Sequence, residues 1–145
     1  MKRLYLAATL WFMSLPALAQ DWGDLNAVIL PALSSSGTSE ATFWLPNVND
    51  PEAASLSLAV VYEYIQGSAG NTSIAVGFFV RQPTGWAFGG TVENLFGHNP
   101  RDAVFADSFV ELTTTTLGPN EPRCCPTMQT RWRVDYQSRT AQRLN

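Results

Sequence analysis

The residues best suited to chemistry are the only two cysteines of the chain, Cys124 and Cys125, which are adjacent and lie between Pro122 and Pro126. Two neighbouring thiols could form a disulfide, bind a soft metal ion such as Cu(I), or exchange electrons with a partner thiol. Adjacent Cα atoms lie about 3.8 Å apart across a trans peptide, below the usual disulfide range of about 4.4–6.8 Å. A disulfide here would therefore close a strained ring, which the two flanking prolines would help to hold.

Three interpretations of the cysteine pair stay open. A structural disulfide is the first, because an exported chain with an even number of cysteines usually forms disulfides. Free or intermolecularly bridged thiols are the second, and a redox or soft-metal role is the third. Adjacent side chains point apart in an extended strand, so a shared metal ion would require a bent loop. No Cys-x-x-Cys motif and no His-rich or Met-rich cluster accompanies the pair, and we assign no metal ligand and no cofactor.

Two further groups of residues could support catalysis, but ordinary roles explain both. His98, the only histidine, could form a thiol–imidazole pair with a cysteine, although a Gly-Asn-Pro segment is typical of an exposed loop. Asp107 and Glu111 would share one face of a strand about 13 Å apart, too far for the paired carboxylates of a glycosidase. Asp102 also fits a solvated surface charge. We therefore predict no enzyme and assign no catalytic residue.

Three tryptophans, Trp44, Trp86 and Trp132, fall on segments that are expected to be strands. They could form a stacking surface for a sugar or line a groove for a protein. The alternative is packing in the core, because aromatic side chains are common on half-buried sheets. A small domain with one sheet can lack the helices to cover both of its faces, and an uncovered aromatic face would be a possible binding surface.

The first 19 residues have the pattern of an export signal. Lys2 and Arg3 form a basic start, residues 4–15 are almost all apolar, and residues 17–19 form a small-x-small cleavage site. The apolar run of about 12 residues is too short to span a bilayer. We therefore predict a signal peptide over residues 1–19 and a periplasmic or secreted protein, with no transmembrane segment after signal removal.

Removal of the signal would leave seven basic residues, all of them arginine, against 12 acidic residues. This balance lacks the basic stripe with which nucleic-acid-binding proteins displace counterions, and it argues against a nucleic-acid partner. About 125 mature residues suffice for one domain with a modest core. We predict a single exported domain over residues 20–138, followed by a frayed tail over residues 139–145.

The cysteines must be positioned by a mainly antiparallel β fold. Residues 21–33 are weakly amphipathic and predict a short N-terminal helix. Alternation of apolar and polar residues predicts strands over residues 42–45, 56–64, 72–81, 86–92, 104–117 and 129–137. A helix over residues 51–65 is the competing interpretation of the second strand. The predicted fold is α+β, with a single sheet of about five strands and the cysteine loop at the tip of the last hairpin.

The segment from Glu121 to Thr127, Glu-Pro-Arg-Cys-Cys-Pro-Thr, resembles an acidic-Pro-x-Cys-Cys-Pro-Ser/Thr motif of small bacterial exported proteins. That group includes the LppP/LprE-type lipoproteins of actinobacteria, and the likeness extends over residues 56–137. The lipid-bearing cysteine of those lipoproteins is missing here, and Glu121 stands where aspartate is expected. The resemblance implies an envelope protein and brings no catalytic residue.

These patterns together predict an exported envelope protein that binds a partner or ligand without catalysing a reaction. The binding surface would be the sheet or the cysteine loop, and the partner would be an envelope protein or a ligand that the sequence does not identify. The alternative is a redox-active or soft-metal-handling protein that uses Cys124 and Cys125.

Overall fold

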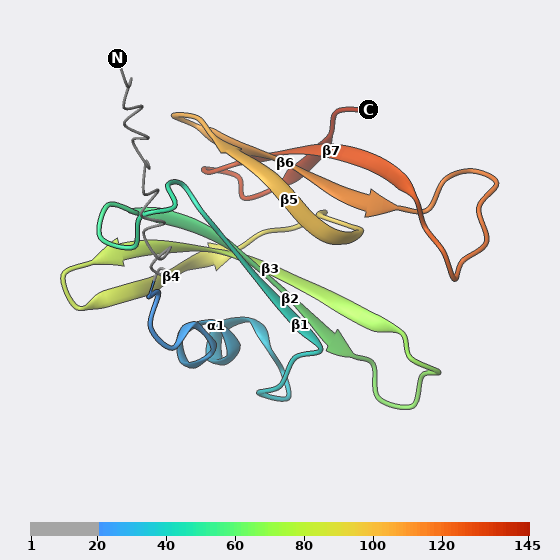
Figure 1. Ribbon diagram of the computed structural model, residues 1–145, viewed down its shortest axis with the longest axis horizontal. Coiled ribbons are helices and arrows are strands. Elements are labelled where there is room, and N and C mark those ends of the chain that lie inside the picture. The colour runs from blue at the N-terminus through green and yellow to red at the C-terminus, as the bar shows by residue number, and fades with distance from the viewer. Residues whose placement is uncertain (1–20) are drawn as a thin grey trace, which may run out of the picture.

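The computed structural model describes residues 21–145 and consists of two antiparallel four-stranded sheets and one short helix (Figure 1). Helix α1 spans Leu25–Leu33. The first sheet pairs its strands in chain order: β1 (Ala41–Pro46), β2 (Leu56–Tyr64), β3 (Thr72–Gln82) and β4 (Gly85–Thr91). The second sheet does the same with β5 (His98–Phe105), β6 (Phe109–Thr116), β7 (Met128–Asp135) and β8 (Ala141–Arg143). The predicted signal peptide lies outside the described residues and stays a prediction.

Mainly antiparallel β structure with one short helix is confirmed, but the prediction of a single sheet of about five strands is wrong. The two four-stranded sheets lie one above the other, with α1 beneath the first sheet (Figure 1). Period-two alternation gives each sheet one apolar face, and two such faces can be buried against each other. Strand periodicity does not reveal which strands share a sheet, and the sequence prediction therefore merged the two.

The main core lies between the two sheets. The first sheet contributes the inward side chains of β2 and β3, and the second sheet contributes those of β6 and β7. The fully or almost fully buried residues of this core include Leu58, Val60, Val76, Phe78, Val110, Leu112, Trp132 and Val134. These are the residues that the alternating pattern placed on one face of each strand.

A second, smaller core lies between the first sheet and α1. Ile29 and Leu33 of the helix pack against Ala59, Val61 and Phe79, which point to the opposite face of the sheet from the main core. The first sheet is therefore covered on both faces, which explains why β2 is apolar at almost every position. This helix is too short to cross a membrane, and residues 21–145 contain no other helix that could.

Two predicted segments have a different structure. The strand expected over residues 104–117 is two strands, β5 and β6, joined by a tight turn in which Ala106 donates its backbone N–H to the carbonyl of Phe109 at 2.8 Å. The tail expected to fray over residues 139–145 contains β8, which pairs with β7. Ala141 is buried at the edge of the main core, and its burial fixes this short strand.

Packing of the two sheets makes Leu112 a position at which truncation is costly. Leu112→Ala removes a side chain that is 1 % exposed, and we expect it to lower the free energy of unfolding by about 2–5 kcal/mol. Val104→Ala is the matched control in the same sheet, because Val104 is 63 % exposed and its loss should change stability by less than about 0.5 kcal/mol. Urea unfolding measures both values, and equal effects would contradict the face-to-face packing.

Candidate functional site: a groove beside the cysteine loop

The candidate site is a groove formed by two adjoining cavities at one end of the two sheets. The larger cavity has a volume of about 490 Å³ and the smaller one about 250 Å³. Both are lined by His98, Arg123 and Pro126, so the two cavities adjoin, and we refer to them together as the groove. The larger cavity is also lined by Gly70, Asn71, Thr72 and Cys124, and the smaller one by Phe96, Gly97, Thr115, Thr116 and Leu117. The groove thus lies between the β2–β3 turn and the cysteine loop, which extend from the same end in Figure 1.

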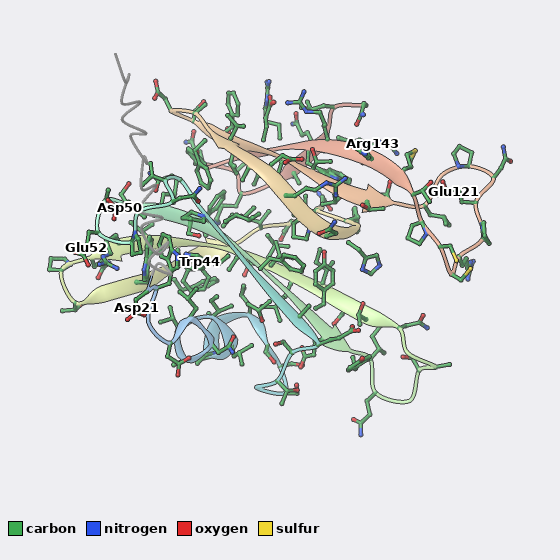
Figure 2. All side chains as sticks on the ribbon, viewed as in Figure 1. Asp21, Trp44, Asp50, Glu52, Glu121 and Arg143 are labelled. Carbon is green, nitrogen blue, oxygen red and sulfur yellow. The ribbon has the colours of Figure 1, made fainter. Side chains whose placement is uncertain are left out.

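The cysteine loop, residues 117–127, is fastened at its base by the carboxylate of Glu121. This carboxylate accepts hydrogen bonds from the backbone N–H of Gly118 at 2.8 Å, from the N–H of Thr127 at 2.9 Å, and from the hydroxyl of Thr127. These bonds, with the Thr127 hydroxyl as the largest cause, lower the pKa of Glu121 to about 2. Figure 2 shows Glu121 on the loop that extends from the second sheet. The acidic position of the motif is therefore a clamp that draws the two ends of the loop together.

A tight turn at the tip of the loop carries the cysteines. Cys125 donates its N–H to the carbonyl of Pro122 at 3.1 Å, so the backbone bends between these residues. Both cysteines are exposed free thiols, and the predicted disulfide is therefore not formed in the structure. The bend nevertheless brings the two thiols together, and a hydrogen bond with Cys124 raises the pKa of Cys125 above the ordinary thiol value. A raised pKa favours the neutral thiol over the nucleophilic thiolate at neutral pH.

The opposite wall of the groove is the crossover segment, residues 92–97, which connects the first sheet to the second. Each sheet fastens it with one side-chain hydrogen bond. The hydroxyl of Tyr62 on β2 donates to the carbonyl of Gly97 at 2.8 Å, and the hydroxyl of Thr114 on β6 donates to the carbonyl of Phe96 at 2.8 Å. Thr114 in turn accepts the indole N–H of Trp132 at 2.8 Å. The crossover is therefore held in a defined position by both layers of the core.

Glycine is required at position 97. Its φ is +98°, in the left-handed region that disfavours other residues. A Cβ atom on Gly97 would lie 2.7 Å from the carbonyl oxygen of Thr115, closer than such atoms approach. The absence of a side chain thus allows the crossover to lie directly against β6.

His98 begins β5 immediately after the crossover. Its ring stacks on that of Tyr62, with 5.4 Å between the ring centroids. Burial raises the pKa of Tyr62, which keeps its hydroxyl a hydrogen-bond donor to Gly97. The prediction that His98 lies in a loop is wrong by a few residues, because the loop ends where β5 starts. His98 and Cys124 line the same cavity, but within residues 21–145 no hydrogen bond joins the imidazole to either thiol.

The groove is lined by nitrogen-bearing and neutral polar side chains. Arg123 contributes a guanidinium and His98 an imidazole, and Asn71 and Thr72 contribute amide and hydroxyl groups. Among residues 21–145, no carboxylate lines either cavity. Within the part of the chain that the structure describes, Arg123 makes no ion pair. Figure 2 shows three acidic side chains, Asp21, Asp50 and Glu52, at the end opposite the cysteine loop, which itself carries Glu121.

The three tryptophans do not form one surface. Trp132 is 6 % exposed, and it lies in the core between the sheets. Trp44 and Trp86 pack edge to face at 4.9 Å on the helix side of the first sheet, and Trp22 packs against both. Core packing therefore explains these residues, and the groove lies elsewhere. Of the two prolines predicted to support the loop, Pro122 accepts the turn hydrogen bond and Pro126 lines the groove.

The candidate carboxylates are also apart from one another. Glu111 bonds both Arg131, at 2.7 Å, and Arg133, at 2.6 Å, on the outer face of the second sheet, and the Arg133 bond is the largest cause of its lowered pKa. Asp102 lies 3.7 Å from the guanidinium of Arg101. These are surface ion pairs, with small effects on stability. Among the described residues, no group of three or more His, Cys, Asp or Glu side chains could hold a metal ion.

Sequence reasoning missed most of the groove. The sequence pattern places Asn71 in a turn and Thr72 and Leu117 at the ends of strands, and it gives none of these residues, nor Phe96, a role in binding. Arg123 lies inside the quoted motif, so its proximity to the cysteines was visible in the sequence. The proximity of the β2–β3 turn to the cysteine loop depends on how the two sheets stack, and no local pattern records that.

Comparisons of the chain with models of protein families, with curated proteins and with solved structures found no match. The resemblance to the LppP/LprE-type lipoproteins stays a prediction. The function of the protein is therefore inferred from the residues that line the groove.

Replacing Glu121 should loosen the cysteine loop. Glu121→Gln keeps one carbonyl acceptor but loses the charge and the second oxygen, so we expect hydrogen exchange at the amides of Gly118 and Thr127 to accelerate at least about tenfold. Glu52→Gln, at the opposite end of the molecule, is the matched control and should leave these amides unchanged. Unchanged exchange in Glu121→Gln would show that the carboxylate does not hold the loop.

The same clamp predicts the pH dependence of the loop. The pKa of Glu121 is about 2 in the folded protein, below its ordinary value of 4.5, so its stabilising contribution is complete above pH 4.5 and is lost as the pH falls through about 2. NMR signals of Gly118 and Thr127 should therefore remain unchanged from pH 7 to pH 4. A transition of these signals near pH 4.5 would contradict the hydrogen-bonded carboxylate.

Proposed function

We propose that this protein is an exported envelope protein that binds an anionic ligand in the groove beside the cysteine loop, without catalysing a reaction. The observation that carries the proposal is the lining of the groove, which combines Arg123 and His98 with neutral polar groups and contains no carboxylate. A guanidinium in a pocket whose lining contains no acidic side chain favours an anionic ligand over a cationic one.

The shape of the groove supports binding by a preformed site. Its two walls are fastened independently: the cysteine loop by Glu121, and the crossover segment by Tyr62 and Thr114. A third element, the β2–β3 turn, is closed by bonds from Ile65 to the Asn71 carbonyl at 2.9 Å and from Asn71 to the Ser68 hydroxyl at 3.1 Å. A site that is already ordered loses little conformational entropy when its ligand binds.

Arg123 is the residue best placed to bind the anion. A guanidinium offers several donors that match the geometry of phosphate or carboxylate oxygens, and this one is exposed and makes no ion pair within residues 21–145. Its position one residue before Cys124, on a turned loop, points to the larger cavity as the place of the charged group.

The sequence supports export to the envelope. The basic start, the apolar run and the small-x-small site have the order of a signal peptide, and the resemblance to exported lipoproteins implies the same compartment. A periplasmic or secreted location would place the groove among the phosphate- and carboxylate-bearing molecules of the envelope.

Inorganic phosphate is the simplest probe of the site. We expect Arg123→Gln to weaken its binding about tenfold, because one charge-assisted hydrogen bond contributes about 1.5–3 kcal/mol. Arg81→Gln is the matched control, since Arg81 lies over Trp86 and away from the groove, and it should bind as the unaltered protein does. NMR titration at constant ionic strength measures both affinities. Equal weakening by the two substitutions would show general charge attraction and contradict the proposed site.

A redox or soft-metal role for Cys124 and Cys125 is the second candidate. The observation that favours it is that a tight turn carries two free, exposed thiols on adjacent residues. The raised pKa of Cys125 argues against a thiolate nucleophile at neutral pH, whereas a soft cation would displace the thiol protons itself.

Replacement of both cysteines separates the two functions. The double variant Cys124→Ser, Cys125→Ser should retain phosphate binding if the groove is an anion site, because the arginine and the walls remain. Loss of phosphate binding in this variant, together with stoichiometric Ag(I) binding by the unaltered protein, would favour the thiol-based function.

A further inference from the structure

The smaller cavity of the groove has a different chemistry from the larger one. Its walls include the side chains of Phe96, Leu117 and Pro126, and it contains no charged group beyond Arg123 and His98, which it shares with the larger cavity. Phe96 is 56 % exposed and Leu117 is 43 % exposed, so two large apolar side chains border it in water. The groove is therefore more polar at one end and more apolar at the other, with Arg123 and His98 bordering both cavities.

The exposure of Phe96 is enforced by the fold. The carbonyl of Phe96 accepts the Thr114 hydroxyl, and the next carbonyl, that of Gly97, accepts the Tyr62 hydroxyl. These two bonds fix the backbone on each side of the residue, and its ring packs at 6.1 Å from that of Trp132. An apolar ring that is held in place while half exposed forms a ready wall for an apolar ligand group.

Leu117 forms the facing part of this wall. It follows the last residue of β6 and precedes Gly118, whose N–H is held by Glu121. The backbone around Leu117 is thus fixed by the strand on one side and by the carboxylate clamp on the other. Both apolar walls are consequently held by the same bonds that shape the polar cavity.

We propose that the groove binds a single-chain amphipathic anion, with its charged head in the larger cavity near Arg123 and His98 and its alkyl chain in the smaller cavity between Phe96 and Leu117. The guanidinium of Arg123 would bind the charged head of the ligand, and the apolar walls would bury its alkyl chain. This inference rests on the proposed anion site and adds the class of ligand that the site takes.

A series of alkyl phosphates tests the inference on the full mature protein. Inorganic phosphate and ethyl, butyl, hexyl and octyl phosphate share the head and differ only in the chain. We expect the dissociation constant, measured by calorimetry below the micelle concentration, to fall about two- to fourfold for each methylene until the chain fills the cavity of about 250 Å³. The uncharged alcohol 1-hexanol should bind much more weakly than hexyl phosphate, because it lacks the head.

Substitutions in the apolar wall test whether the alkyl chain of the ligand binds in the smaller cavity. Leu117→Asn should remove most of the dependence of the dissociation constant on chain length. Val104→Asn is the matched control, since Val104 is also an exposed apolar residue but lies on the outer face of the second sheet, and this variant should retain the full dependence. Circular dichroism of both variants establishes that each is folded.

The outcomes distinguish the two levels of the proposal. Binding of phosphate with no dependence on chain length would overturn the inference and leave the anion site standing. No binding of any phosphate would overturn the anion site and the inference together. Equal binding of hexanol and hexyl phosphate, or loss of the chain-length dependence in Val104→Asn instead of Leu117→Asn, would overturn the amphipathic arrangement. Tighter binding of an acidic, leucine-containing peptide than of octyl phosphate would overturn it in favour of a protein partner.

Discussion

The fastening of the crossover segment by one side-chain hydrogen bond from each sheet is the constraint on which the site depends. Tyr62 of the first sheet and Thr114 of the second donate to consecutive carbonyl groups, those of Gly97 and Phe96. Both donors extend from buried positions in the core, so the connection between the layers cannot shift without breaking core hydrogen bonds. An unpaired polar group left in such a core would be costly. The crossover thereby sets the position of His98, which stacks on Tyr62 at the mouth of the groove.

The cysteine loop forms the other wall of the groove. The tip of this loop is exposed and contributes no side chain to either core. The carboxylate of Glu121 holds the two ends of the loop together with three hydrogen bonds. The loop therefore presents Arg123 and the cysteines on a defined turn. Of the vicinal thiols, which first draw attention in the sequence, only Cys124 lines the groove, whereas Arg123 and His98 line both of its cavities and support the proposed function.

Most of the strands could be predicted from the sequence, but little of the candidate site could. Strand alternation located the strands that form the first sheet, and it even separated Phe79, which faces the helix, from Val76 and Phe78, which face the core. It did not separate β5 from β6, because the turn Ala-Asp-Ser at 106–108 has no glycine or proline to mark it. The division into two sheets and the meeting of the β2–β3 turn with the cysteine loop are consequences of layer packing. Because the groove arises from that packing, residues such as Leu117 had no local signal.

The most direct test of a preformed groove is a backbone NMR map of the mature protein with and without octyl phosphate. We predict amide shifts confined to the walls of the groove, at residues 70–72, 96–98, 115–118 and 123–125, with hydrogen-exchange protection at the crossover already present in the free protein. Shifts centred on the Trp44 and Trp86 cluster, or a crossover that becomes protected only after the ligand binds, would contradict it.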